Sequence, residues 1–487
     1  MSRVLLMVPH EDDESLVGGP MLVNLCRSGY EVFVYIATNG DYYPFESGAR
    51  ARESLEALKM MGVDRSKVIF GGYGDSWQGT GIYDSGYDEV KTSAAGFRAT
   101  HGPARDIDEW HFVRTNEHVS YTKGAYREDI EELIDRLRPD VIITVGFDSH
   151  PDHRTLYLMT LEALALLFKK DPAYSPAFLE KFAYEGNAFG SKDFFRFPHL
   201  PSMPPLSEFG TAFNFWEDRI CYRVPGDCNS VFMASNLLFK VLLCYRTQHI
   251  WHMADSVINS DTVYWQRNMA NKILGAELTA TSGEVCWLND NKLFEPDNAD
   301  EEYCDLTSLC FRPEPEDEEK TVKVRLKEPS DIKLILLYFN TPGGISTDVR
   351  LKLYPEDGRE KVISKHYESK NDFSVFKIET EGGSCRGFSL RFENVRGSLG
   401  LGEIEALEKE PELPFAEFLA APQDRGRSLF LTMALRLEWL LFNVMKLIDM
   451  VGILCDRKKA RYDKKRFNVL PVGDCGSDPA VYEERNL

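Results

Sequence analysis

Several features that mark specialised classes of protein are missing from this 487-residue sequence. Its 10 cysteines form no CxxC pair and no regular framework, which argues against cysteine–zinc sites and a disulfide scaffold. Reduced, packed thiols in a cytoplasmic protein are the better interpretation. No stretch of about 18 apolar residues is free of charge, so a transmembrane helix is not indicated. The first residues carry no signal-peptide pattern, and we expect a cytoplasmic location.

An excess of positive charge is also missing. The chain has 57 Lys and Arg against 77 Asp and Glu, a net charge of −20, which argues against nucleic-acid binding. It has no GxxxxGK phosphate loop, no GxGxxG at the first turn and no GxSxG elbow. What is present is ordinary for a folded protein: 43% hydrophobic and 28% charged residues, over a length that accommodates two or three domains.

The first part of the chain alternates short apolar runs with helical patterns, which predicts a Rossmann-like α/β domain over residues 1–280. Strands separated by helices form a parallel sheet, and function then gathers at the carboxyl ends of the strands. The apolar runs lie at 4–8, 32–37, 68–70 and 141–145. Helical patterns at 238–259 and 265–274 are expected to complete this domain.

The rest of the chain changes character twice. Residues 281–411 contain short alternating runs separated by Gly- and Pro-containing turns, the pattern of an all-β sandwich. Residues 412–487 are expected to form an amphipathic helical tail, in which 425–466 holds 11 basic against four acidic residues. We favour a helical hairpin docked on the protein's own surface. The alternative is peripheral contact with the inner face of a membrane through 425–466.

Two clusters of histidine and carboxylate residues follow predicted strands. The first is His10-Glu11-Asp12-Asp13-Glu14 and the second is His150-Pro151-Asp152-His153. Because the carboxyl ends of parallel strands share one edge of the sheet, these clusters can converge although they are far apart in the sequence. Two imidazoles and one carboxylate suit a catalytic zinc ion, and a second carboxylate would be free to take a proton from the metal's water.

Each cluster also has a plain structural interpretation. Adjacent aspartates at the start of a helix often cap it and complement its dipole, which alone would explain Asp12 or Asp13. His153 alone would pass for a surface residue at a helix start. Both clusters at matching positions of one sheet are hard to attribute to coincidence, and together they favour a metal centre.

The succession of motifs resembles the PIG-L/LmbE-like zinc de-N-acetylases over about residues 2–275. The residues that carry the resemblance are Pro9-His10-Glu11-Asp12-Asp13-Glu14, Thr38-Asn39-Gly40-Asp41, Arg50-x-x-Glu53 with Ala57 and Gly62, Gly72-Tyr73-Gly74-Asp75, and Ser149-His150-Pro151-Asp152-His153-Arg154. Residues 259–265 and 274–276 are similar to bacterial members that carry a discoidin-like, galactose-binding-type β-sandwich. Residues 337–340 and 400–405 look like strands of that sandwich.

This resemblance implies the composition of the metal centre. His10, Asp13 and His153 match the zinc ligands of the family. Asp12 matches the general base that activates the water. Zinc is the cofactor implied in this way, and Fe2+ suits the same nitrogen and oxygen ligands.

The resemblance also implies roles toward the substrate. His150 matches the imidazole that stabilises the oxyanion and protonates the leaving amine, and Asp152 would orient it. Arg50 falls where members of the family contact a substrate phosphate or sugar. Tyr245 and Gln248 stand where members often have a His and a Gln, so substrate contacts there differ from the family pattern.

The implied activity is a metal-dependent hydrolase that removes the N-acetyl group of an N-acetylated amino sugar by zinc-activated water. The substrate would be a glycolipid or a surface-polysaccharide precursor, met in the cytoplasm or at the inner membrane face. Two alternatives stay open: an amidase acting on a different sugar conjugate, and a non-catalytic carbohydrate-binding protein. The complete set of His10, Asp12, Asp13, His150 and His153 argues against the second alternative.

Overall fold

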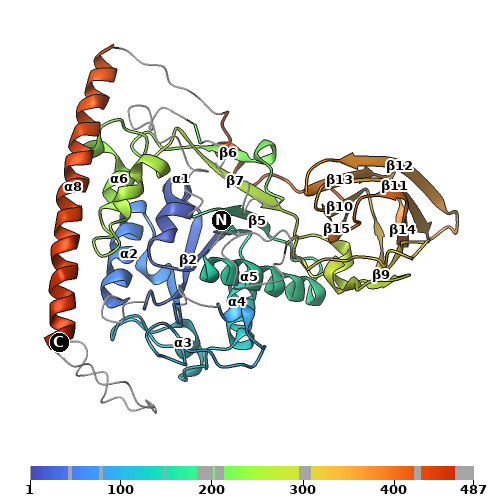
Figure 1. The fold of residues 1–487 in the computed structure, drawn as a ribbon, viewed down its shortest axis with the longest axis horizontal. Coiled ribbons are helices and arrows are strands. Elements are labelled where there is room, and N and C mark those ends of the chain that lie inside the picture. Colours follow the sequence, from blue (N-terminus) through green and yellow to red (C-terminus); the bar gives the residue numbers. More distant parts are fainter. Residues whose placement is uncertain are drawn as a thin grey trace.

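The computed structural model describes residues 2–41, 47–75, 81–146, 150–183, 201–202, 213–294, 309–421 and 429–466. Figure 1 shows three parts along the chain: an α/β domain, a β-sandwich and one long C-terminal helix. This order of architectures confirms the predicted fold class.

A seven-stranded sheet forms the centre of the α/β domain, in the order β3-β2-β1-β4-β5-β7-β6. The first five strands of this order run parallel, whereas β7 is antiparallel to β5 and to β6. Residues 4–8 of β1 are wholly buried, as an apolar run in the middle of a covered parallel sheet must be. The strands are β1 (Arg3–Val8), β2 (Glu31–Thr38), β3 (Val68–Tyr73), β4 (Val141–Val145), β5 (Ala177–Lys181), β6 (Ile220–Arg223) and β7 (Asp261–Arg267).

Helices connect these strands and cover the sheet. They are the π-helical turn η1 (Glu14–Gly18), α1 (Gly19–Arg27), α2 (Ser47–Met61), α3 (Trp110–Thr115), α4 (Lys123–Leu137), α5 (Pro151–Lys170), α6 (Leu237–Leu242) and α7 (Ala254–Val257). Short 3-10 turns lie at Arg65–Lys67, Ile82–Asp84, Trp216–Asp218, Met233–Ser235, Ile250–Met253, Lys272–Gly275, Val285–Leu288 and Ala416–Phe418. The chain leaves β1 toward β2 and later returns to β4 on the other side of β1. The strand order therefore reverses between β1 and β4, which is where open α/β sheets bind ligands.

The helix expected over 265–274 is wrong in its first half. Residues 261–267 form the strand β7, which pairs with β5 and β6, and only Lys272–Gly275 makes a 3-10 turn. The run Thr262-Val263-Tyr264-Trp265 is rich in β-branched and aromatic side chains, which pack well on a pleated surface. The expected helix 238–259 is interrupted as well, because α6 ends at Leu242 and helical structure resumes only at Ile250.

The sandwich consists of two antiparallel sheets, in the orders β13-β10-β15 and β12-β11-β14-β9-β8. Side chains from both sheets share one core, in which Leu337, Leu351 and Leu390 are fully buried. Its strands are β8 (Glu277–Ala280), β9 (Thr321–Asp331), β10 (Leu334–Asn340), β11 (Ile345–Pro355), β12 (Lys361–Ser369), β13 (Phe373–Glu379), β14 (Ser384–Arg396) and β15 (Leu401–Leu407). The division between residues 280 and 281 stays a prediction, and β8, just before it, pairs with the sandwich strand β9.

Within the described part of the tail, residues 429–466 form a single helix, α8 (Leu429–Arg466), rather than the expected hairpin. Its sequence contains no proline, and its one glycine, Gly452, does not interrupt the backbone hydrogen bonding. Over the described parts of the chain, no helix is both long enough and apolar enough to cross a bilayer.

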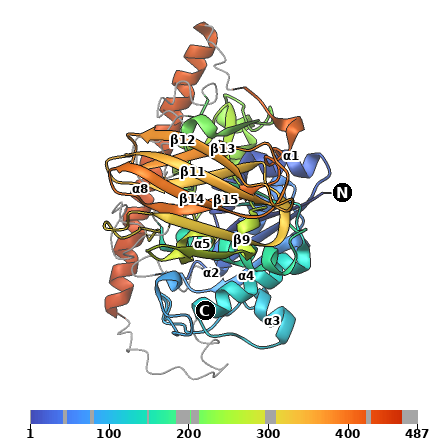
Figure 2. The same ribbon diagram turned by 90° about the vertical axis from the view of Figure 1, so that its right-hand side faces the viewer.

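The sandwich and α8 lie on opposite sides of the α/β domain (Figures 1 and 2). The segment after β15 returns along the domain before α8 begins, and Phe415 and Phe418 enter the core of the α/β domain. Tyr222 of β6 holds this segment, because its hydroxyl donates a hydrogen bond of 2.9 Å to the carbonyl of Pro414. The segment that precedes α8 is thereby connected to the α/β domain.

Candidate metal centre

The two predicted clusters meet where the sheet order reverses. β1 pairs in parallel with β4, so the loop after Val8 and the start of α5 emerge at the same edge of the sheet. His150 caps α5: its imidazole accepts a hydrogen bond of 3.2 Å from the backbone N–H of Asp152. Pro151 occupies the first turn, where a missing N–H does no harm. Ser149, which contributed to the sequence motif, lies outside the described residues.

Asp13 lies between the two clusters. Its Oδ2 is 3.2 Å from His10 Nδ1 and 3.3 Å from His153 Nε2, and all three side chains are buried. The ring centres of His10 and His153 are 5.4 Å apart, and that of His150 is 4.6 Å from His10. The structure thus brings together the three residues predicted as metal ligands.

Among the described residues, two overlapping sets of side chains can present ligand atoms within 4.8 Å of one another. One set is His10, His150 and His153, and the other is His10, Asp75 and Asp152. Oδ1 of Asp12 and Oδ1 of Asp13 are buried and accept no hydrogen bond from any described group. Unpartnered carboxylate oxygens beside converging imidazoles are the donors that a borderline divalent cation prefers, so these residues fit a metal ion.

The local charge supports the same assignment. Seven buried carboxylates surround the cluster, and Arg50 is a buried cation among them. The carboxylates are Glu11, Asp12, Asp13, Glu14, Asp41, Asp75 and Asp152. Burying so many carboxylates is costly unless positive charge accompanies them, and a divalent cation supplies that charge compactly.

The backbone holds Asp12 in an unusual conformation, with φ of 157°, that non-glycine residues rarely adopt. Its N–H donates a hydrogen bond of 2.9 Å to Glu14 Oε2, and Tyr245 and Ser54 donate to the other oxygen of Glu14. Burial, together with repulsion by Asp13, raises the pKa of the Asp12 carboxyl. A carboxylate of raised pKa is better suited to take a proton near neutral pH.

Asp13 shows the opposite behaviour. Burial opposes its charged form, but the positive charge of His153 and the hydrogen bonds from both histidines outweigh burial and lower its pKa. Adjacent carboxylates whose pKa values are moved in opposite directions are typical of sites in which one stays ionised and the other handles protons.

The imidazole of His150 is the least buried of the three. Burial, with repulsion from His10 and His153, lowers the pKa of His150 to about 2, so the ring is neutral at pH 7. Because Nδ1 accepts the backbone N–H of Asp152, the ring proton stands on Nε2. The Asp152 carboxylate lies closer to His10, at 3.2 Å from Nε2, than to His150, at 3.8 Å from Nδ1.

Arg50 of α2 lies against the acidic edge of the centre. Its Nε is 3.6 Å from Glu11 Oε2, and its Nη1 is 3.9 Å from Asp75 Oδ2 and donates to the carbonyl of Gly40 at 3.3 Å. Gly40 has φ of +56°, and a Cβ there would meet Glu11 Oε2 at 2.4 Å and the Arg50 guanidinium at 2.7 Å. A glycine is therefore required for Arg50 and Glu11 to approach each other.

Three residues at this site were not assigned a role from the sequence. Asp75, at the end of β3, belongs to one of the ligand sets, and the motif Gly72-Tyr73-Gly74-Asp75 was its signal. Glu14 and Tyr245 support the loop that carries Asp12, with a Tyr245–Glu14 hydrogen bond of 2.8 Å. Tyr245 lies 231 positions after Glu14, a contact that no local pattern indicates.

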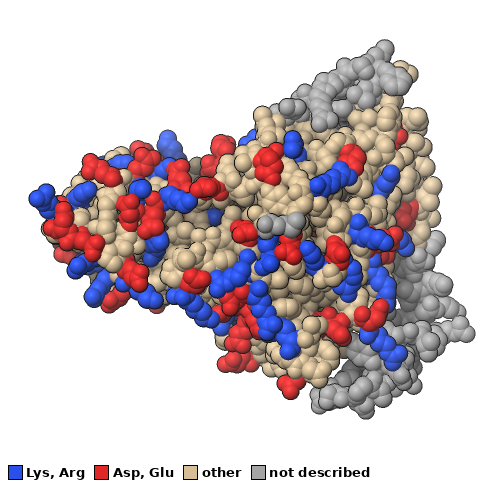
Figure 3. All heavy atoms as spheres, turned by 180° about the vertical axis from the view of Figure 1, so that it is seen from behind, with Lys and Arg blue, Asp and Glu red and all other residues tan. Residues whose placement is uncertain are grey.

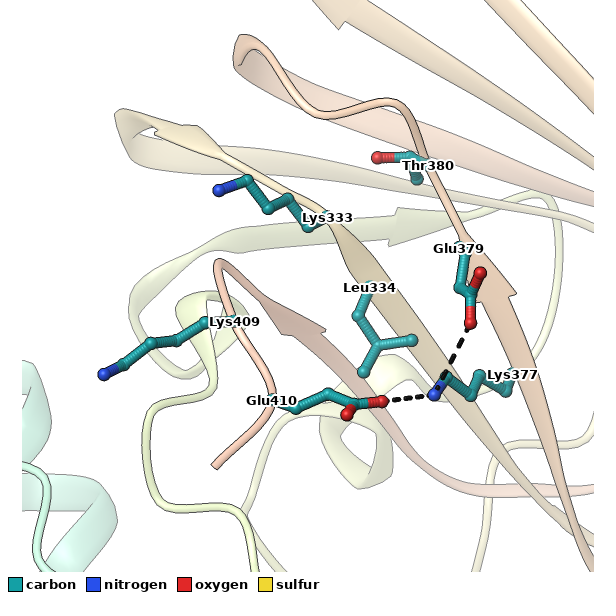
Figure 4. Close-up of a pocket in the computed structure, with 7 residues that line it drawn as sticks. All are labelled: Lys333, Leu334, Lys377, Glu379, Thr380, Lys409 and Glu410. Atoms are coloured by element: carbon teal, nitrogen blue, oxygen red, sulfur yellow. Dashed lines mark hydrogen bonds and ion pairs between the residues drawn. The ribbon is translucent and has the colours of Figure 1, made fainter. Parts of the chain in front are cut away.

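A pocket on the sandwich lies apart from these residues (Figure 4). It is lined by Lys333, Leu334, Lys377, Glu379, Thr380, Lys409 and Glu410. Its lysines are neutralised locally, since Lys377 pairs with Glu379 and Glu410, and Lys409 pairs with Glu412 at 2.8 Å. The pocket contains no histidine and no unpaired carboxylate among its lining residues, so it does not compete with the metal centre as a reaction site.

Fold and site together define an α/β domain with a histidine- and carboxylate-rich centre at the carboxyl ends of its strands. Residues 5–164 match the family model described as PIG-L: GlcNAc-PI de-N-acetylase. The chain therefore contains a PIG-L domain, which confirms the resemblance expected from the motifs.

A curated relative agrees with this assignment. A 1D-myo-inositol 2-acetamido-2-deoxy-alpha-D-glucopyranoside deacetylase of Corynebacterium jeikeium is 27% identical over 187 residues, 34% of this chain and 50% of the relative. The chain spans about half the length of the curated relatives that it matches.

Solved structures resemble each of the two folded parts. A deacetylase of the teicoplanin biosynthesis pathway is 20% identical, covers 54% of this chain and 97% of its own length, and has a TM-score of 0.33. CpGH89CBM32-6 of Clostridium perfringens is 17% identical, covers 28% of this chain and 94% of its own length, and has a TM-score of 0.21.

Proposed function

We propose that the protein is a metal-dependent deacetylase that hydrolyses the N-acetyl group of an N-acetylated amino sugar. The observation that carries this proposal is the buried group of Asp12, Asp13, His10, His150 and His153, inside a PIG-L domain and at the point where the sheet order reverses. His10, Asp13 and His153 would hold the ion, and Asp75 lies within reach of the same place.

A divalent ion bound there supplies a water of lowered pKa and polarises the acetyl carbonyl. Asp12, whose pKa is raised, takes the proton from the attacking water. Neutral His150 donates a hydrogen bond from its Nε2–H to the oxygen on which negative charge develops. A neutral imidazole has no second proton to give up, so the proton that Asp12 took from the water passes to the departing nitrogen. The C–N bond of the amide breaks, and acetate and a free amine leave.

We propose zinc as the ion, with Fe2+ as the alternative. Both ions accept imidazole nitrogen and carboxylate oxygen as ligands. Softer ions prefer thiolate ligands, which are scarce at this site. None of the described cysteines belongs to the ligand sets above.

We propose an amino sugar carried by a larger conjugate, a glycolipid or a polysaccharide precursor, as the substrate. The relatives support this class, because their names specify 2-acetamido-2-deoxyglucopyranosyl inositol or N-acetylglucosaminyl phosphatidylinositol. Arg50, beside the acidic edge of the centre, is the candidate for contacting a sugar hydroxyl or a phosphate. An amidase acting on a different sugar conjugate would use the same centre and differ only in these outer contacts.

We further propose a reducing compartment, the cytoplasm, as the place of action. Six described cysteines support it, because Cys26, Cys221, Cys228, Cys244, Cys286 and Cys385 are free thiols. Unpaired cysteines in this number are more common where glutathione keeps thiols reduced.

The function is tested by acetate release from N-acetylglucosaminyl inositol, with N-acetylglucosamine and its lipid-linked forms as further substrates. We expect Asp12→Asn to lower the rate by about 10²–10⁴-fold, the usual contribution of a general base. Metal content, measured by mass spectrometry on the same samples, should stay unchanged, because Asp12 is not among the proposed ligands.

Asp88→Asn is the matched control, since Asp88 is an exposed aspartate of the same domain. It should leave both acetate release and metal content at the wild-type level. Full activity of the Asp12→Asn variant would rule out Asp12 as the base. A wild-type protein that holds metal but releases no acetate from any of these sugars would favour a different amide, and a protein that neither holds metal nor releases acetate would favour the carbohydrate-binding alternative.

A further inference from the structure

The helix α8 turns its polar side chains toward the protein. Glu438 accepts a hydrogen bond of 3.1 Å from the backbone N–H of Met233, and Asp449 Oδ2 lies 2.8 Å from His249 Nδ1 and 2.9 Å from His252 Nε2. Leu435 and Phe442 are buried on this same face. Phe442 packs against the rings of Phe239 and Trp251, at 6.2 and 5.8 Å between ring centres.

The opposite face of α8 is apolar and exposed. Ile448 is 67% exposed, Met433 64% and Leu437 59%. Met450 and Trp439 are also exposed but lie on the far side of Arg436. At 100° per residue, the other exposed apolar positions between 433 and 451 span an arc of about 160° that contains no charged residue. They are Met433, Leu437, Leu440, Leu441, Val444, Met445, Leu447, Ile448 and Val451. On the side drawn in Figure 3, the edge of the molecule along this part of α8 is almost free of charged side chains.

An ordinary surface helix buries its apolar side and shows its polar side to water, whereas α8 leaves most of its apolar side chains exposed. An exposed apolar patch of this extent marks a surface that another phase or molecule covers. The polar group of Asn443, at the border of the arc, is already satisfied, because its amide donates 2.8 Å to the carbonyl of Trp439. The exposed face can therefore be removed from water without leaving the Asn443 amide unsatisfied.

Two features favour a lipid surface over a second copy of the chain. An arc of about 160° is wider than the narrow seam through which two helices pair, but it suits a helix half immersed in a bilayer interface. The end of α8 is basic: residues 454–466 hold seven Lys and Arg against two Asp, a net charge of +5. Two copies packed in parallel would bring these charges together, whereas anionic headgroups would neutralise them.

The flanks of the arc agree with that orientation. Trp439 and Arg436 lie on α8 beside the apolar positions rather than within them, and both are exposed. Tryptophan and arginine at such borders are common where a helix lies between headgroups and acyl chains. The remainder of the protein is acidic, since the net charge of the chain is −20 including this basic end.

We propose that α8 attaches the protein to an anionic membrane surface, lying along the plane of the bilayer with residues 433–451 in the interface and 454–466 near the headgroups. The helix does not cross the bilayer in this arrangement, in keeping with the finding for spanning helices above. The face opposite the lipid stays docked on α6 and on the turn at Ile250–Met253. This proposal does not depend on the deacetylase activity.

Flotation of the full chain with vesicles tests it directly. The protein should float with vesicles made of equal amounts of phosphatidylcholine and phosphatidylglycerol, and much less with phosphatidylcholine alone. Added salt should reduce the bound fraction, because the headgroup attraction is screened. The triple variant Leu440→Gln, Leu447→Gln, Ile448→Gln should lower the bound fraction by about tenfold or more, since three apolar anchors are lost.

A matched triple variant, Val113→Gln, Val362→Gln, Leu413→Gln, replaces exposed apolar residues on other elements and should bind like the wild type. The comparison of the two vesicle types needs no variant, so it holds even if a substitution disturbs folding. Equal binding by both triple variants, or no flotation of the wild type with anionic vesicles, would overturn the proposal. A wild-type dimer in light scattering that the α8 variant converts to a monomer, without vesicle binding, would instead identify a second copy as the partner.

Discussion

At the scale of single residues, the centre is governed by an excess of buried negative charge. Asp12 and Asp13 are neighbours in the sequence, yet burial raises the pKa of one while two histidines lower that of the other. Burial alone would raise both values. The different outcome comes from the position of each carboxylate relative to the histidines, and it suits the roles of base and ligand that we propose for these two neighbours.

Gly40 offers a residue-scale prediction. We expect Gly40→Ala to lower the free energy of unfolding by about 1–2 kcal/mol, since alanine is strained at positive φ. It should also reduce acetate release, because the new Cβ would displace Glu11 and Arg50. Denaturant unfolding and steady-state kinetics measure the two effects.

Gly29→Ala is the control for that experiment. Gly29 has φ of +81°, but a Cβ there would meet nothing within 4 Å. It should show a similar loss of stability and no loss of activity. If the two variants had the same activity, the pair formed by Glu11 and Arg50 would have no part in turnover.

The sequence was sufficient to predict which residues of the two main motifs come together, because each motif follows a strand and parallel strands end at one edge. As a result, Asp13 Oδ2 lies 3.2 Å from His10 Nδ1 and 3.3 Å from His153 Nε2. Tyr245 could not be assigned to the support of Glu14 from the sequence, because that contact depends on how the segment after α6 folds back. Nor could the sequence show that Asp152 lies closer to His10 than to His150.

At the scale of elements, the strands with continuous apolar runs were predicted well and the elements with distant partners were not. β1, β2, β3 and β4 have local signals strong enough to identify them. β7 was not predicted, and its last three residues were expected to begin a helix, because β7 pairs with β5 and β6, which lie about 85 and about 40 positions earlier in the sequence. For α8 the composition indicated a helix, but the absence of a turn was visible only in the structure.

The junction between β7 and β15 gives an element-scale prediction. Arg267 is buried, donates to Tyr157 Oη at 2.9 Å and to the carbonyl of Asn291 at 3.2 Å, and offsets the charges of Glu180 and Glu405. Arg267→Met would leave these two carboxylates buried without a cation. We expect a loss of about 3–5 kcal/mol in the free energy of unfolding, measured by denaturant titration.

Arg267→Lys retains the positive charge and should cost less than the methionine variant. The carboxylates are sensitive to this change because burial raises the pKa of Glu180 and of Glu405. An Arg267→Met variant as stable as the wild type would mean that the junction of the two domains is held by its apolar contacts and by Asn271, which donates to the Ile404 carbonyl at 2.9 Å, rather than by Arg267.

At the scale of the whole molecule, the α/β domain lies between two further elements. The sandwich is fixed to one side through Asn268, Asn271 and Arg267, and α8 covers the other side (Figure 1). If α8 rests on a membrane, the sandwich points away from that membrane (Figure 2). With this layout, one chain would bind a lipid surface through α8 and expose the sandwich on the opposite side of the molecule.

Removal and return of the metal tests the central claim most directly. The full chain, stripped with a chelator, should lose acetate release and regain it when a stoichiometric amount of Zn2+ is added, because Asp12 and His150 act on a water and a carbonyl that the ion must polarise. Recovery with Fe2+ instead would change the identity of the ion and leave the account intact. Undiminished acetate release by the metal-free chain would contradict it.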